Sequence, residues 1–187
     1  MHFRFDHFFK KLLRALLSAV GRVDAELEVA VDAQRIDLLF TPGLRVRPCR
    51  RGAGRAPAAP AAPDLEALGL LGRIVASCCI LEAFHAPPSV EEIRGCMRKQ
   101  LNWHHSQVLR AKQRARASRA PLRPKVGRAP QRATAQAAPS PPPIPVLWIL
   151  SSGRPEGVVE RFAFQPFEGW PAGVYTAPLA EVPVRLV

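Results

Sequence analysis

Two acidic residues lie inside apolar segments, where an unpaired carboxylate is costly. Asp37 lies in "RIDLLF" and Glu82 in "CCILEAF". A buried carboxylate has to be paired, protonated or bound to a cation. If segments 34–42 and 73–84 form neighbouring strands, alternation lets Asp37 and Glu82 converge on one face. Two carboxylates at one point suit Mg²⁺, or Mn²⁺ in its place, and such an ion holds a phosphate and activates water.

A simpler arrangement is compatible with the same spacing. Each acid could instead pair with a local base, such as Arg35 or Arg73, or lie at a strand end. Spacing alone leaves both interpretations open, because it fixes which side of a strand a residue occupies and not what it contacts.

The elements that would position these acids follow from hydrophobic periodicity. A broad apolar face predicts a helix over 7–20, with Asp6 as its N-cap and Gly21 ending it. Ser89 and Glu92 form a capping box after a Pro-Pro pair and predict a second helix from Val90 to about Arg114. The apolar stripe of this second helix is Val90, Ile93, Met97, Leu101 and Val108. The expected strands are 23–31, 34–42, 73–84, 146–152, 159–167 and 173–179, with a further strand beginning in the final "VPVRLV".

Connection lengths predict how these strands pair. The first three are joined closely enough to form an antiparallel meander, and the helix before 146–152 suits a crossover. The sequence therefore predicts a single α/β domain over 1–187, with a mixed sheet flanked by helices.

The net charge of +12 is concentrated in two Pro-rich segments. Five arginines and no acid lie in 43–63, which is expected to be an insertion, and nine basic residues and no acid lie in 109–132. We expect 117–145 to be a disordered basic linker. Basic segments bind nucleic acid through its phosphates, and the candidates here are Arg110, Lys112, Arg114 and Arg116. A solvated insertion without a partner is the open alternative.

Cysteine spacing and the N-terminal segment favour a cytoplasmic protein. The four cysteines include no C-x-x-C pair, so zinc and redox motifs are not indicated and free thiols are expected. Lys10, Lys11 and Arg14 interrupt the apolar pattern that a signal peptide requires. No apolar run has the length of a membrane span.

The order of four segments adds a resemblance to a known family. "DHFFKKLLRALL", "RIDLLF", "LEAF" and "VEEIRGCMRKQL" follow one another as in the PD-(D/E)XK nuclease superfamily, within its bacterial recombination-promoting nuclease/putative transposase group. The resemblance covers about residues 3–116 and, more loosely, 147–157. It implies a restriction-endonuclease-like fold, a DNA substrate, and Mg²⁺ bound by Asp37 and Glu82.

The chain departs from the family motif two residues after Glu82. Phe84 stands where the motif has Lys, and it can neither orient water nor stabilise developing charge. Some superfamily members supply the base from the following helix, which makes Lys99 and Gln100 candidates. The resemblance thus implies a Mg²⁺-dependent DNA endonuclease with Asp37, Glu82, Lys99 and Gln100 as catalytic residues.

Two alternatives remain open. One is a non-catalytic module of the same fold that binds nucleic acid or protein, which Phe84 favours. The other is a membrane-surface protein that uses the basic N-terminal helix and the basic segments.

Overall fold

The structure is a computed structural model that describes residues 3–29, 34–43, 65–119, 142–179 and 181–187. The helices are α1 (Phe3–Leu17), α2 (Leu70–Ile74), α3 (Val90–Arg119) and α4 (Glu156–Arg161), with a 3-10 turn at Glu66–Leu68. The strands are β1 (Gly21–Val29), β2 (Gln34–Pro42), β3 (Cys79–Phe84), β4 (Val146–Ser151), β5 (Gln165–Pro166), β6 (Tyr175–Thr176) and β7 (Val184–Leu186).

These strands form one mixed sheet in the order β1-β2-β3-β4-β7-β6-β5. β1, β2 and β3 are antiparallel neighbours, and β4 lies parallel to both β3 and β7. The meander and the α3 crossover expected from connection lengths are both confirmed. The fold is α/β, with a mixed sheet flanked by helices.

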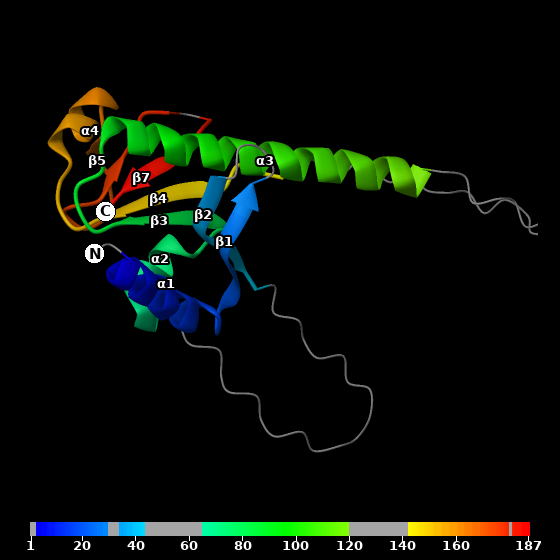
Figure 1. The fold of residues 1–187 in the computed structure, drawn as a ribbon, viewed down its shortest axis with the longest axis horizontal. Coiled ribbons are helices and arrows are strands. Elements are labelled where there is room, and N and C mark those ends of the chain that lie inside the picture. Colours follow the sequence, from blue (N-terminus) through cyan, green and yellow to red (C-terminus); the bar gives the residue numbers. More distant parts are fainter. Residues whose placement is uncertain (1–2, 30–33, 44–64, 120–141, 180) are drawn as a thin grey trace, which may run out of the picture.

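The helices cover the sheet from two sides (Figure 1). α1 and α2 lie on one side, where Leu17 and Ile74 are buried in a core with Phe40 and Trp148. α3 and α4 lie on the other, where Ile93 and Val158 join a second core with Ile80, Leu147 and Ile149. A helix on each face explains why β3 and β4 read as continuous apolar runs.

The capping box at the start of α3 is formed as the sequence predicts. The Ser89 N–H donates to Glu92 Oε2 at 2.7 Å, and the Glu92 N–H donates to Ser89 Oγ at 3.2 Å. α3 continues to Arg119, five residues past the expected end and into the expected linker, and its C-terminal half extends beyond the sheet (Figure 1). Leu101 is exposed, so its place in the apolar stripe was wrong.

Two segments predicted as strands contain helices. The expected strand 73–84 begins only at Cys79, because Leu70–Ile74 forms α2. The expected strand 159–167 begins inside α4, which ends at Arg161, and only Gln165–Pro166 is strand, as β5. A short apolar run does not distinguish a buried helical turn from a buried strand.

The N-terminal elements begin earlier than expected. α1 starts at Phe3, so Asp6 lies within the helix and is not its cap, and β1 starts at Gly21. Most of the expected insertion 43–63 and most of the expected linker 117–145 lie outside the described residues. Within the described ranges, no helix is both long enough and apolar enough to cross a membrane.

Candidate active site

Asp37 and Glu82 lie opposite each other on β2 and β3. The antiparallel β2–β3 ladder pairs Leu38 with Leu81, the chain neighbours of the two acids. At the next pair, Asp37 and Glu82, the side-chain carboxylates accept hydrogen bonds in place of the backbone carbonyls of the ladder. The Asp37 N–H donates to Glu82 Oε1 at 3.4 Å, and the Ala83 N–H donates to Asp37 Oδ2 at 3.2 Å. Each acid therefore accepts a backbone N–H from the neighbouring strand, so the two acids are adjacent, but their carboxylates turn to opposite faces of the sheet and not to one face as the sequence predicts.

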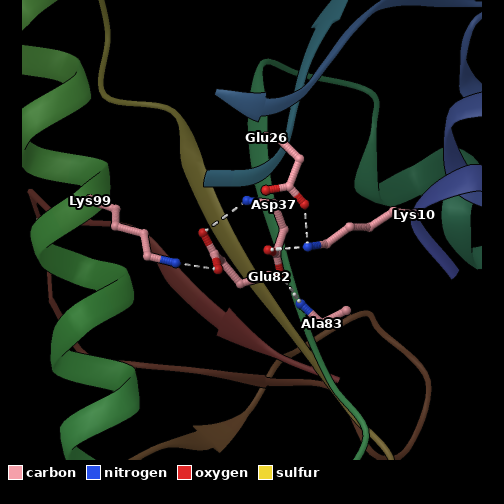
Figure 2. Close-up of polar contacts among 6 residues, drawn as sticks. All are labelled: Lys10, Glu26, Asp37, Glu82, Ala83 and Lys99. Atoms are coloured by element: carbon pink, nitrogen blue, oxygen red, sulfur yellow. Dashed lines mark hydrogen bonds and ion pairs between the residues drawn. The ribbon is translucent and has the colours of Figure 1, made fainter. Parts of the chain in front are cut away.

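Two lysines from helices on opposite sides of the sheet contact this acid pair (Figure 2). Lys10, on α1, lies 2.8 Å from Asp37 Oδ1 and 2.7 Å from Glu26 Oε1. Lys99, on α3, donates to Glu82 Oε2 at 2.8 Å. The two acids and the two lysines form a charged cluster that crosses the sheet, called the junction below. Asp37 faces α1 and Glu82 faces α3.

A backbone irregularity in β1 brings Glu26 to this junction. Glu26 has a backbone φ of +53°, a conformation that residues other than Gly rarely adopt. It lies opposite Asp37, between the pairs Ala25–Leu38 and Leu27–Ile36. Ala25 packs with the core under α1 and Leu27 with the core under α3. Residues two apart in a regular strand share one face, so the side chains of β1 change sides of the sheet at Glu26. The exchange directs the Glu26 side chain to Lys10.

Burial dominates the electrostatics of Glu82, which is only 2 % exposed. Burial, and then the nearby charge of Asp37, raise the pKa of Glu82 to about 7, although Lys99 opposes the shift. Burial lowers the pKa of Lys99, but the charge and hydrogen bond of Glu82 outweigh it, and the net direction is upward. The junction thus holds a carboxyl that titrates near neutral pH beside a charged ammonium.

The other residues expected at the site are placed elsewhere. Phe84, at the motif position of Lys, packs against the core under α3. Gln100 is fully buried, and its Nε2 donates to the carbonyls of Pro145 at 2.7 Å and Pro183 at 3.1 Å. Its described contacts tie α3 to the starts of β4 and β7 and do not include the acids. Arg110, Lys112, Arg114 and Arg116 are exposed on the extended half of α3.

Sequence reasoning missed Lys10 and Glu26. The signal for Lys10 was present, because residues 10, 13 and 17 share one helical face and Leu13 and Leu17 are buried. A lysine on a buried face needs an acid, and Asp37 and Glu82 were the two acids in apolar segments without an assigned partner. Glu26 had no such signal, since its position depends on an unusual backbone conformation.

The junction offers a hard divalent cation carboxylate oxygens, provided that it displaces the lysines that contact Asp37 Oδ1 and Glu82 Oε2. Asp37 and Glu82 supply carboxylate oxygens from two strands, which suits Mg²⁺ when water or phosphate oxygens complete its shell. Among the described residues, no group of three or more His, Cys, Asp or Glu side chains is placed to hold a metal. An ion here would therefore have few protein ligands.

The thiols in the described part of the chain are free, as expected. They are Cys78, Cys79 and Cys96, and burial raises the pKa of all three. Such thiols stay protonated at neutral pH, which makes them poor nucleophiles and metal ligands.

Comparison with protein-family models, with curated proteins and with solved structures finds no match to this chain. The fold and the junction by themselves define the class: an α/β protein with a mixed seven-stranded sheet and a lysine-flanked acid pair at the centre of that sheet.

Proposed function

We propose that the protein is a Mg²⁺-dependent DNA endonuclease of the PD-(D/E)XK type, with a restriction-endonuclease-like fold. Asp37 and Glu82 hold the ion, which when bound supplies Lewis-acid stabilisation of a phosphodiester and a more acidic water. Mn²⁺ is expected to substitute for Mg²⁺. The free thiols are compatible with a cytoplasmic location, which is part of this proposal.

The observation that supports this proposal best is the contact between Lys99 and Glu82, at 2.8 Å. The superfamily motif requires a lysine beside its second acid, and Phe84 cannot fill that role. Lys99 brings an ammonium to the same carboxylate from α3, and its raised pKa keeps it charged at neutral pH. A charged lysine next to the ligand set stabilises negative charge that develops on a phosphate.

DNA binding is assigned to the extended half of α3. Arg110 and Arg114 are spaced by four residues, as are Lys112 and Arg116, so the helix carries positive charge on two sides. Contacts of this kind bind phosphates irrespective of base sequence, and their affinity falls steeply with salt.

A non-catalytic module of the same fold is the second candidate, and a specific observation favours it. All four carboxylate oxygens of Asp37 and Glu82 already accept or contact a donor within the chain. Two lysines balance the two acids, so the junction has a structural role even without an ion. In this second candidate, nucleic-acid or protein binding persists and hydrolysis is absent.

Nicking of supercoiled plasmid in MgCl₂ or MnCl₂ tests the first proposal. The wild-type protein should nick, Asp37→Asn should lose at least a hundredfold in rate, and Lys99→Met should lose a comparable factor. Glu28→Gln is the matched control, because Glu28 is an exposed β1 acid that pairs with Arg35 outside the junction. It should nick at the wild-type rate.

The outcomes separate the two candidates. Equal nicking by wild type and Asp37→Asn means a contaminating nuclease and removes the proposal of catalysis. Salt-sensitive plasmid binding without nicking supports the binding module. Circular dichroism of each variant confirms that a lost activity does not reflect a lost fold.

A further inference from the structure

A second cluster, of aromatic rings and arginines, lies on the α1–α2 side of the sheet and includes neither Asp37 nor Glu82. Its rings are Trp148 on β4 and Phe167 and Trp170 between β5 and β6, and its charges are Arg73 on α2 and Arg185 on β7. Phe167 and Trp170 are stacked, with ring centroids 5.3 Å apart. The ring centroids of Trp170 and Trp148 are 5.0 Å apart. The cluster is therefore an aromatic group that contacts two guanidinium groups.

The Arg185 guanidinium lies against all three rings. Its Cζ is 4.0 Å from the centroid of Phe167, 5.3 Å from that of Trp148 and 6.0 Å from that of Trp170. Among the described residues it has no ion-pair partner, and its Nε is buried without a hydrogen-bond acceptor. Stacking uses the face of a guanidinium and leaves its in-plane N–H donors available.

Trp148 also has a buried N–H without a hydrogen-bond acceptor among the described residues. It is 1 % exposed, and its Nε1 has no hydrogen-bond acceptor. Trp148 and Arg185 are register partners on the neighbouring strands β4 and β7. Two adjacent residues thus each bury an N–H donor without an acceptor, an arrangement that costs free energy unless something completes it.

Arg73 adds a second positive charge. Its Cζ is 4.1 Å from the Trp170 centroid, and its described hydrogen bond goes to the Gly169 carbonyl at 2.7 Å. Both guanidinium groups contact the same indole, so they lie within about one Debye length, roughly 10 Å, of each other. No carboxylate in the described part of the chain lies within ion-pair distance of either arginine.

We infer that this cluster, formed by Arg185, Arg73 and Trp148, is a binding site for an oxyanion of the phosphate class. The planar Arg185 fork is the main donor, since it matches the two oxygens of a phosphate. Arg73 contributes charge, and the Trp148 N–H gains the acceptor that it lacks. The phosphate is either free in solution or part of a nucleic-acid strand. The site does not depend on the proposed nuclease function.

Tryptophan fluorescence of the full-length protein tests this inference, because the bound anion would lie beside two indoles. We would titrate sodium phosphate against sodium chloride at matched ionic strength, and separately the dinucleotide TpT, which carries one phosphodiester. A saturable change with either probe is expected in the wild type. Arg185→Met should weaken it at least tenfold, and Arg73→Met should weaken it severalfold.

Arg22→Met is the matched control, because it removes an exposed arginine that pairs with Asp24 on the other side of the sheet centre. It should leave the titration unchanged. Trp148→Phe keeps an aromatic ring, although a smaller one, and removes the indole N–H, so it should weaken binding even if Arg185→Met fails to fold. Saturation by phosphate indicates a free anion, and saturation by TpT alone indicates a strand. No saturation, or equal loss in Arg22→Met, overturns the inference.

Discussion

The buried Glu82 carboxyl should make the stability of the protein fall as pH rises toward neutrality. Its pKa in the folded chain is about 7, against an ordinary value of 4.5. The folded state therefore holds a proton that the unfolded state releases, and unfolding becomes easier as pH rises from about 4.5 to about 7. At roughly 1.4 kcal/mol for each pKa unit, Glu82 should remove about 3 kcal/mol from the free energy of unfolding by pH 8.

Urea unfolding at pH 5, 6, 7 and 8, followed by circular dichroism, measures this loss. Other groups titrate over the same range, so the relevant quantity is the difference between wild type and Glu82→Gln. Gln keeps an oxygen for the Asp37 N–H but cannot ionise. The difference should change by roughly 2.5 kcal/mol between pH 5 and pH 8, because part of the titration lies below pH 5, with wild type losing stability relative to the variant.

A difference that does not change with pH would refute the reasoning, because it would mean that Glu82 titrates at the same pH in both states. Magnesium extends the test. An ion held by Asp37 and Glu82 binds the deprotonated carboxyl, so MgCl₂ should reduce the loss above pH 7 in wild type and not in Glu82→Gln.

Three further substitutions probe the surroundings of the site. Lys10→Met leaves Asp37 without its ammonium partner, so it should lower the melting temperature, yet MgCl₂ should raise that temperature more than in wild type; an equal rise contradicts this. Gln100→Leu leaves the buried Pro145 carbonyl without its Gln100 donor, while the Pro183 carbonyl keeps the Leu147 N–H, and it should cost about 1–3 kcal/mol in urea unfolding, with nicking per folded molecule unchanged; lost nicking at full stability would instead make Gln100 a site residue. Ser89→Ala should cost about 1 kcal/mol by the same assay, and no cost would mean that α3 does not need its cap.

Local signals predicted the parts of the fold that depend on neighbouring residues. The Ser89–Glu92 capping box is such a signal, and α3 begins where it indicates. The alternation in β2 and the short connections predicted the β2–β3 pairing that brings Asp37 opposite Glu82. The capping box and the alternation depend on residues close together in the chain, whereas the β2–β3 pairing joins residues 45 apart and depended on the expected meander.

The features that sequence reasoning missed depend on contacts between distant segments. α2 lies at the start of a long apolar run that suits a helix as well as a strand. The contact between Lys99 and Glu82 needs the parallel crossover to place α3 over β3, so Lys99 could only be one candidate among several. The junction with Glu26 requires a left-handed residue in β1, which composition does not indicate.

The way Asp37 and Glu82 replace the β2–β3 ladder has an evolutionary consequence. Each carboxylate does the work of a main-chain acceptor, so losing either one leaves an N–H of the neighbouring strand without a partner. A descendant of an active enzyme could therefore abandon hydrolysis and still be selected to keep both acids. In a set of homologues, retention of the acid pair would then report the architecture of the sheet, and retention of Lys99 would report the proposed catalysis.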